Sequence, residues 1–133
     1  MTPIIPHHGL FGRREWRLGP IRQSYFHRID RAIAGRGHPI IAAGVHPTSS
    51  VEKRARQLKQ QVVEQFEAMQ LDERGILIAH SMGGLDARFA LSQLGLSRYV
   101  KTLGTIATPH RGSPYADWLV RNVGDRFGLL KAA

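Results

Sequence analysis

The chain has 133 residues, which fits one domain, because domains commonly run to ~100–150 residues. It contains no cysteine, which excludes a disulfide framework and a thiolate metal site. The formal net charge is +9, but the arginines are scattered and lack interleaved aromatics, so we expect a solvated basic surface rather than a nucleic-acid site.

No apolar run approaches the ~18 residues of a membrane-spanning helix. The first residues lack the basic segment and the long apolar segment of a signal peptide. These two observations predict a cytoplasmic protein. The densest basic cluster is predicted to lie on the outer face of a helix, and it comprises Lys53, Arg54, Arg56 and Lys59.

Predicted strands and helices alternate along the chain. The first strand is interrupted by Pro6, which confines it to an edge or an irregular position, and a loop is predicted over residues 9–20. Gly35 and Gly37 end the first helix, and a turn with an N-cap precedes the second. The predicted strands cover residues 3–8, 38–45, 76–79 and 99–107, and the predicted helices cover residues 25–34, 51–71, 82–94 and 115–123.

The helix over residues 51–71 has the clearest pattern, because its apolar residues recur at steps of three and four and gather on one face. The strand over residues 76–79 is apolar at every position, which is typical of a parallel sheet covered on both faces. The alternation therefore predicts an α/β fold: a parallel sheet of about four strands joined by right-handed crossover helices.

The segment ILIAHSMGG at residues 76–84 carries the strongest chemical signal. An apolar strand ends at Ser81, and a helix follows two glycines. This is the setting of a nucleophile elbow, in which a sharp turn exposes a serine and its neighbours two positions away must be small. Ala79 and Gly83 occupy those positions, so the pattern is A-x-S-x-G. The alternative interpretation is an ordinary turn with Ser81 as a helix cap.

A serine nucleophile also needs donors for the oxyanion that forms during acyl transfer. One backbone N–H comes from the residue after the nucleophile, here Met82, and another comes from a loop after an early strand. The segment HHGL at residues 7–10 follows the first predicted strand. We therefore predict that the N–H groups of Leu10 and Met82 form the oxyanion hole.

Three segments together resemble the α/β-hydrolase superfamily on its lipase and esterase side, especially bacterial and fungal triacylglycerol lipases. They are HGLFG at 8–12, AHSMGGLDAR at 79–88 and GTIATPHRGS at 104–113. The likeness covers nearly the whole of this chain, which corresponds to only the N-terminal half of that fold. It implies carboxylic-ester hydrolysis through an acyl-enzyme at Ser81, with no metal or organic cofactor.

The resemblance also implies that several other polar residues are not members of the catalytic triad. Asp86 and Arg88 match the motif as structural helix residues, and His80 points away from the reaction. His110 matches a loop on the substrate side, whereas the base of the family follows a later strand. The family's acid also follows a later strand, which argues against Asp117 and Asp125. No triad acid or base is therefore expected within this chain.

We accordingly expect a single, truncated hydrolase domain over residues 1–133, with an open apolar sheet edge that favours self-association. Its substrate would be a small-molecule or lipid ester, with peripheral lipid contact through Trp16 and Trp118 as one interpretation and ordinary packing of these rings as the other. The alternative function is a non-catalytic hydrolase remnant, or an interaction module that uses its basic surface. That module would bind anionic partners in a salt-sensitive way, independently of Ser81.

Overall fold

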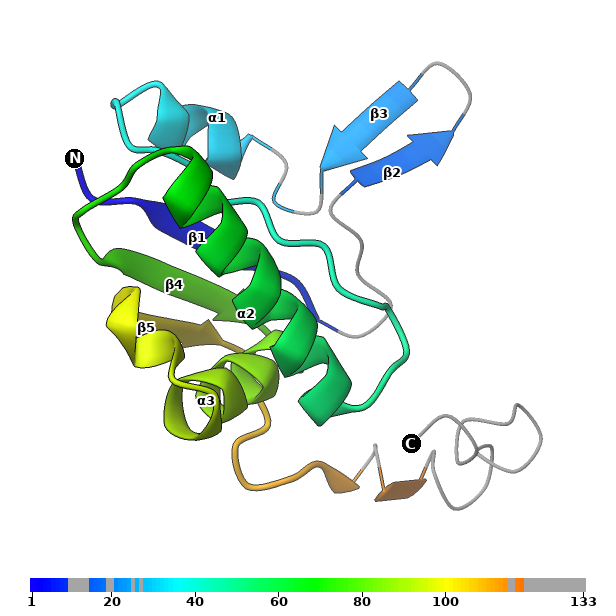
Figure 1. The fold of residues 1–133 in the computed structure, drawn as a ribbon. Helices are drawn as coiled ribbons and strands as arrows, with labels where there is room; N and C mark the ends of the chain where they lie inside the picture. The colour runs from blue at the N-terminus through cyan, green and yellow to red at the C-terminus, as the bar shows by residue number, and fades with distance from the viewer. Residues whose placement is uncertain (10–14, 19–20, 25, 27, 115–116, 119–133) are drawn as a thin grey trace.

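The computed structural model describes residues 1–9, 15–18, 21–24, 26, 28–114 and 117–118. At its centre lies a parallel three-stranded sheet with the order β1-β4-β5 (Figure 1). The strands are β1 (Ile4–His7), β4 (Gly75–His80) and β5 (Val100–Ile106). The predicted α/β class and the parallel sheet are confirmed.

The register of the sheet brings the carboxyl ends of all three strands to one edge. His7 pairs with Ala79, and His80 at the end of β4 pairs with Ile106 at the end of β5. In open parallel sheets, ligands bind outside the carboxyl ends of the strands. The segments that carry the predicted chemistry begin at this edge.

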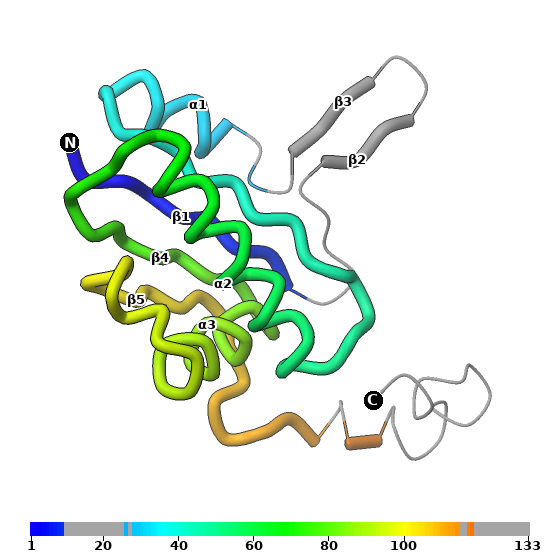
Figure 2. Tube along the Cα trace, viewed as in Figure 1, coloured from blue at the N-terminus to red at the C-terminus, as the bar shows by residue number. Residues whose placement is uncertain are grey.

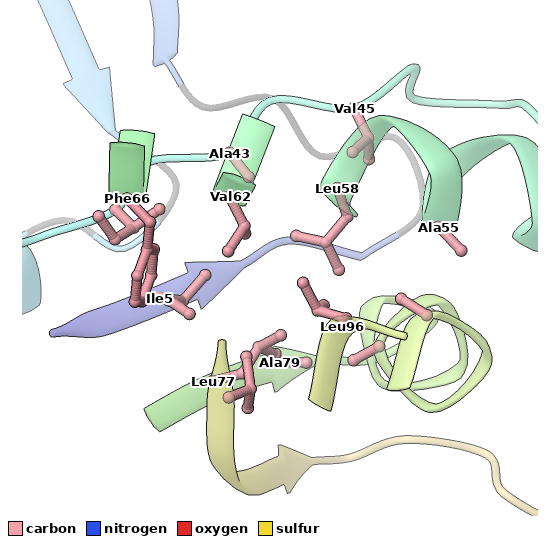
Figure 3. Packing of buried hydrophobic residues seen from close by; sticks show 14 residues of the cluster. Ile5, Ala43, Val45, Ala55, Leu58, Val62, Phe66, Leu77, Ala79 and Leu96 are labelled. Carbon is pink, nitrogen blue, oxygen red and sulfur yellow. The ribbon is translucent and has the colours of Figure 1, made fainter. Parts of the chain in front are cut away.

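Two helices, α2 (Val51–Ala68) and α3 (Gly83–Gln93), cover one face of the sheet. The Ser50 hydroxyl caps α2 by accepting a hydrogen bond from the Lys53 N–H. Figure 3 shows the side chains of Leu58, Val62 and Phe66 directed toward those of the sheet. The buried core comprises Ile5, Ile41, Ala43, Val45, Ala55, Leu58, Val62, Phe66, Leu77, Ala79, Ala87, Ala90, Leu96 and Val100.

The opposite face of β4 is less covered than its apolar sequence predicts. Leu77 and Ala79 are fully buried, whereas Ile76, Ile78 and His80 are half-buried. Among the described residues, the second face of β4 is therefore only partly covered. The described sheet ends at β5, where most side chains are exposed or half-buried.

The N-terminal connections differ from the prediction. The loop expected over residues 9–20 contains β2 (Glu15–Leu18), which pairs antiparallel with β3 (Ile21–Ser24). The helix α1 (Ile29–Ala34) is shorter than the one predicted over residues 25–34. A short 3-10 helix, η1 (Leu96–Arg98), precedes β5. No helix within the described parts of the chain has the length and apolar character to cross a membrane.

At the C-terminal end, the described residues give partial support for the predicted helix over 115–123. Pro114, Asp117 and Trp118 have helical backbone, and the Asp117 N–H donates to the Ser113 carbonyl. The rest of that range lies outside the described residues.

The predicted strand over residues 38–45 is wrong, although its backbone is extended beside β1. A single bridge links Ile40 to Ile4, and the Ile41 N–H donates to the Ile4 carbonyl. Figure 2 shows this segment crossing from the end of α1 to the start of α2. Beyond this bridge, many of its backbone groups bind side chains.

Three glutamines on α2 take the place of a neighbouring strand. Gln65 pairs with both the N–H and the carbonyl of Ala42, at 3.1 and 2.8 Å. Gln61 pairs in the same way with Gly44, at 2.9 and 2.7 Å, and Gln57 accepts from the His46 N–H at 2.7 Å. Four residues of helix rise ~6 Å. Two residues of extended chain rise ~6.6 Å. The two spacings match.

We predict that Gln65→Ala lowers the free energy of unfolding by ~1–3 kcal/mol, because it removes two hydrogen bonds from a part-buried backbone segment. Urea unfolding followed by circular dichroism measures this change. Gln60→Ala is the matched control, since Gln60 lies on the same helix and its side chain bonds the exposed Glu64. Equal losses in the two variants would contradict the role of the glutamine pairing.

Candidate active site

Ser81 lies in the turn between β4 and α3 with a backbone φ of 55°. A positive φ is strained for a residue other than glycine and persists where the surrounding structure enforces it. The Ser81 N–H donates to the Ile106 carbonyl at 2.8 Å, which anchors the turn to the end of β5. The local geometry is that of the predicted elbow.

Two glycines allow the segment after β1 to lie directly against this turn. A Cβ on Gly9 would come within 2.8 Å of the Ser81 Cβ and 3.3 Å of its Oγ. A Cβ on Gly83 would come within 2.5 Å of the His8 carbonyl oxygen. The distances of 2.8 Å at Gly9 and 2.5 Å at Gly83 are too short for a Cβ atom, so these positions require glycine. The predicted oxyanion segment and the elbow are thus in contact at His8 and Gly9, while Leu10 lies outside the described residues.

A third glycine makes room for Thr108, which follows β5. A Cβ on Gly84 would come within 2.1 Å of the Thr108 Oγ1. That hydroxyl donates to the Ser81 carbonyl at 2.8 Å. The segment after each of the three strands therefore contributes to one small region around Ser81.

Behind this region lies a buried ion pair that the sequence pattern did not reveal. The Arg54 Nε donates to the Asp86 Oδ2 at 2.8 Å, and both side chains are fully buried. His7 is also fully buried, and its Nε2 lies 2.8 Å from the same oxygen. The prediction that Arg54 lies on the outer face of its helix is therefore wrong. Its spacing four residues before Leu58 and eight before Val62 could have placed it in the apolar stripe.

The remaining Arg54 donors bind backbone carbonyls of two loops. Its Nη2 donates to the carbonyls of His8 and Gly9, at 2.9 and 3.2 Å. Its Nη1 donates to the carbonyls of His46 and Pro47, at 3.2 and 3.4 Å. A planar guanidinium presents five N–H donors in fixed directions, so one side chain can join these segments to Asp86.

The two histidines at the end of β1 are held in the neutral form. Burial lowers the pKa of His8 to about 4, and it also lowers the pKa of His7, against the opposing effect of Asp86. The His8 Nε2 accepts the Val45 N–H at 3.3 Å, so its ring proton lies on Nδ1, which donates to the Gly9 carbonyl at 3.0 Å. His8 therefore braces the same segment as Arg54.

The described residues do not place a catalytic base at Ser81. The His110 Nδ1 accepts from the Arg88 Nη1 at 3.1 Å, so its Nε2 carries the proton and lies 3.0 Å from the Thr105 Oγ1. The Nε2 of His7 is bound to Asp86, and no described residue bonds its Nδ1. Asp86 is committed to Arg54 and His7.

The other candidates are placed in part. Trp118 is more than half exposed, whereas the side chain of Trp16 lies outside the description, as does Asp125. Within the described residues, no three histidine, aspartate or glutamate side chains gather as a metal site.

We predict that stability falls as the pH drops from ~6.5 toward the His8 pKa of about 4. In this range the unfolded state binds more protons than the folded state, because the folded pKa is lowered, so the free energy of unfolding decreases as pH falls. Urea unfolding on both sides of this range measures the slope. His8→Gln should reduce the slope, and the remainder is due in part to His7, whose pKa is also lowered by burial. A slope unaffected by His8→Gln would contradict the prediction.

We also predict that Gly9→Ala destabilises the fold by ~1–3 kcal/mol, the usual cost of overpacking, because the new methyl overlaps Ser81 and the His80 carbonyl. Thermal unfolding measures the loss. Gly104→Ala is the control, since its Cβ would meet no atom closer than 4.0 Å. If Gly9→Ala were as stable as Gly104→Ala, the close contact between the two segments would be refuted.

The chain is similar to several lipases. It is 34% identical over 100 residues to triacylglycerol lipase 2 of Saccharomyces cerevisiae, covering 72% of this chain and 31% of the relative. It is 37% identical over 122 residues to a triacylglycerol lipase of Vibrio cholerae, covering 91% of this chain and 36% of the relative. The chain thus spans about a third of the length of these curated relatives.

Solved structures show the same fold. The mature Bacillus licheniformis lipase BlEst2 superposes with a TM-score of 0.76 at 24% identity, covering 96% of this chain and 50% of that one. Staphylococcus hyicus lipase gives a TM-score of 0.63 at 17% identity, covering 95% and 47%. The family model of the PGAP1-like alpha/beta domain matches residues 48–128. The resemblance to lipase-like α/β-hydrolases is confirmed, and the chain belongs to the PGAP1-like α/β domain family.

Proposed function

We propose that this chain carries the nucleophile and the oxyanion hole of a carboxylic-ester hydrolase of the lipase or esterase type, with Ser81 as the nucleophile. The observation that carries the proposal is the strained φ of 55° at Ser81, in a turn at the carboxyl edge of a parallel sheet. A strained serine in this setting is a feature of nucleophile elbows. The contact of Gly9 with Ser81 supports it further.

In the proposed reaction, the Ser81 Oγ attacks the ester carbonyl carbon and its proton passes to a base. The carbon–oxygen bond to the alcohol then breaks, the alcohol leaves with that proton, and water hydrolyses the acyl-enzyme. The N–H groups of Met82 and Leu10 would bind the oxyanion, helped by the positive N-terminal end of α3. This chemistry requires no metal or organic cofactor.

The described residues around Ser81 include neither the catalytic base nor its acid partner, so the proposed reaction needs both from elsewhere. His110 is a poor candidate because Arg88 and Thr105 engage its two ring nitrogens. The Saccharomyces and Vibrio relatives are named triacylglycerol lipases, which favours a lipid ester as the substrate of this chain. The relatives extend well beyond the matched region, and the same holds for the BlEst2 structure.

We predict that a fluorophosphonate probe labels Ser81 covalently, with an Oγ–phosphorus bond formed and fluoride released. Intact-mass and peptide mass spectrometry would locate the adduct. Ser81→Ala should abolish labelling, whereas Ser92→Ala should leave it unchanged. Ser92 is a suitable control because it is exposed on α3 and its hydroxyl bonds the Arg88 carbonyl.

Labelling should be run with and without added imidazole, which supplies an external base if none reaches Ser81 within the chain. Faster labelling with imidazole would indicate that the base is the missing part. The proposal is wrong if folded protein shows no Ser81 adduct in either condition, or if Ser81→Ala is labelled as fast as the wild type.

A further inference from the structure

We propose that Thr108 and Arg54 are positioning residues of the oxyanion hole, each holding the carbonyl side of one peptide whose N–H is a proposed donor. This inference rests on the proposed function and adds to it two side chains that do not touch the substrate. Thr108 acts on the Ser81–Met82 peptide, and Arg54 acts on the Gly9–Leu10 peptide.

The Ser81–Met82 peptide is held at its oxygen by two donors. The Thr108 hydroxyl donates to the Ser81 carbonyl at 2.8 Å, and the Gly84 N–H donates to it at 3.1 Å. In a trans peptide, the N–H and the carbonyl point in opposite directions. None of the described peptide bonds is cis. Fixing the Ser81 oxygen therefore fixes the direction of the Met82 N–H, which faces away from Thr108.

The backbone around Thr108 is built for this contact. Ala107 adopts a φ of 52°, a second strained residue at the carboxyl edge of the sheet. The turn that it makes brings Thr108 onto the α-carbon of Gly84, where no side chain would fit. Just before it, the Ile106 carbonyl accepts the Ser81 N–H. The end of β5 thus holds Ser81 through the peptide groups on both sides of its α-carbon.

The Gly9 carbonyl is held in a corresponding way. The Gly9 carbonyl accepts from the Arg54 Nη2 at 3.2 Å and from the His8 Nδ1 at 3.0 Å. Arg54 is itself fixed, because its Nε is bound to the buried Asp86. Leu10 lies outside the described residues, so the argument for this peptide stands on the Gly9 oxygen and its two donors.

The hydrogen bond from the Thr108 hydroxyl to the Ser81 carbonyl is called the clamp below. Thr108→Val tests it, because this change keeps the shape of the side chain and removes the hydroxyl. We expect the rate constant for fluorophosphonate labelling of Ser81 to fall ~10-fold, less than the ~10²–10³-fold loss that follows deletion of an oxyanion donor. Thr108→Ser should restore the rate. Thr105→Val is the matched control, since Thr105 lies in β5 and its hydroxyl bonds His110 rather than the elbow.

Thermal unfolding of each variant separates a local effect from a loss of fold. The proposal is overturned if folded Thr108→Val is labelled at the wild-type rate, or if Thr105→Val slows labelling to the same degree. An outcome in which the wild type is labelled but the variants do not differ would leave the proposed function standing and remove the clamp.

An NMR measurement tests the clamp even if wild-type Ser81 is not labelled. In ¹H–¹⁵N spectra, Thr108→Val should shift the Met82 amide resonance and speed its hydrogen exchange, while Thr105→Val should not. Arg54→Lys keeps the charge beside Asp86 and loses the planar fork, so it should shift the amide resonance of Leu10. Unchanged Met82 and Leu10 amides in the respective folded variants would refute the proposal.

Discussion

The buried pair of Arg54 and Asp86 is the interaction on which the rest of the site depends. It joins α2 to the first turn of α3, and through the other guanidinium donors it reaches the loops after β1 and before α2. Burying two charges is costly, and removing one partner of such a pair costs ~3–5 kcal/mol. Through its five hydrogen bonds to other segments, one guanidinium contacts all of them at once. The proposed nucleophile turn begins the same helix that carries Asp86.

Around this pair, the site also depends on close approaches to the backbone of three glycines. Gly9, Gly83 and Gly84 each face an atom that would collide with a Cβ. Because these glycines have no side chain, the segments at the ends of β1, β4 and β5 can lie in contact around Ser81. Burial is the main cause that lowers the pKa of both His7 and His8, and the charge of the neighbouring Arg54 lowers it further.

The sequence predicted the parts of the fold that depend on local pattern. The helix at 51–71, the strand that ends before Ser81 and the elbow itself were all accessible, because each rests on neighbouring residues. The charge of Arg54 predicts a solvent-facing position, whereas its helical spacing from Leu58 and Val62 is that of the buried stripe. The segment over 38–45 has the apolar composition of a strand, with Ile40, Ile41 and Val45 before a turn signal. Nothing local shows that its hydrogen bonds go to glutamines on a helix. The glycines and charged residues over 9–20 predict a loop, so the antiparallel pair of β2 and β3 is not expected from the sequence.

The glutamine pairing also determines at which edge a further strand could join the sheet. The Ile41 N–H is used toward β1, while the backbone groups of Ala42 and Gly44 on the other side are bound to Gln65 and Gln61. An additional strand approaching from that side would find these groups occupied by a helix. Within the described residues, β5 is the edge that keeps backbone groups available for pairing. Any extension of this sheet, whatever chain supplies it, would therefore add next to the strand that holds Ser81 in place.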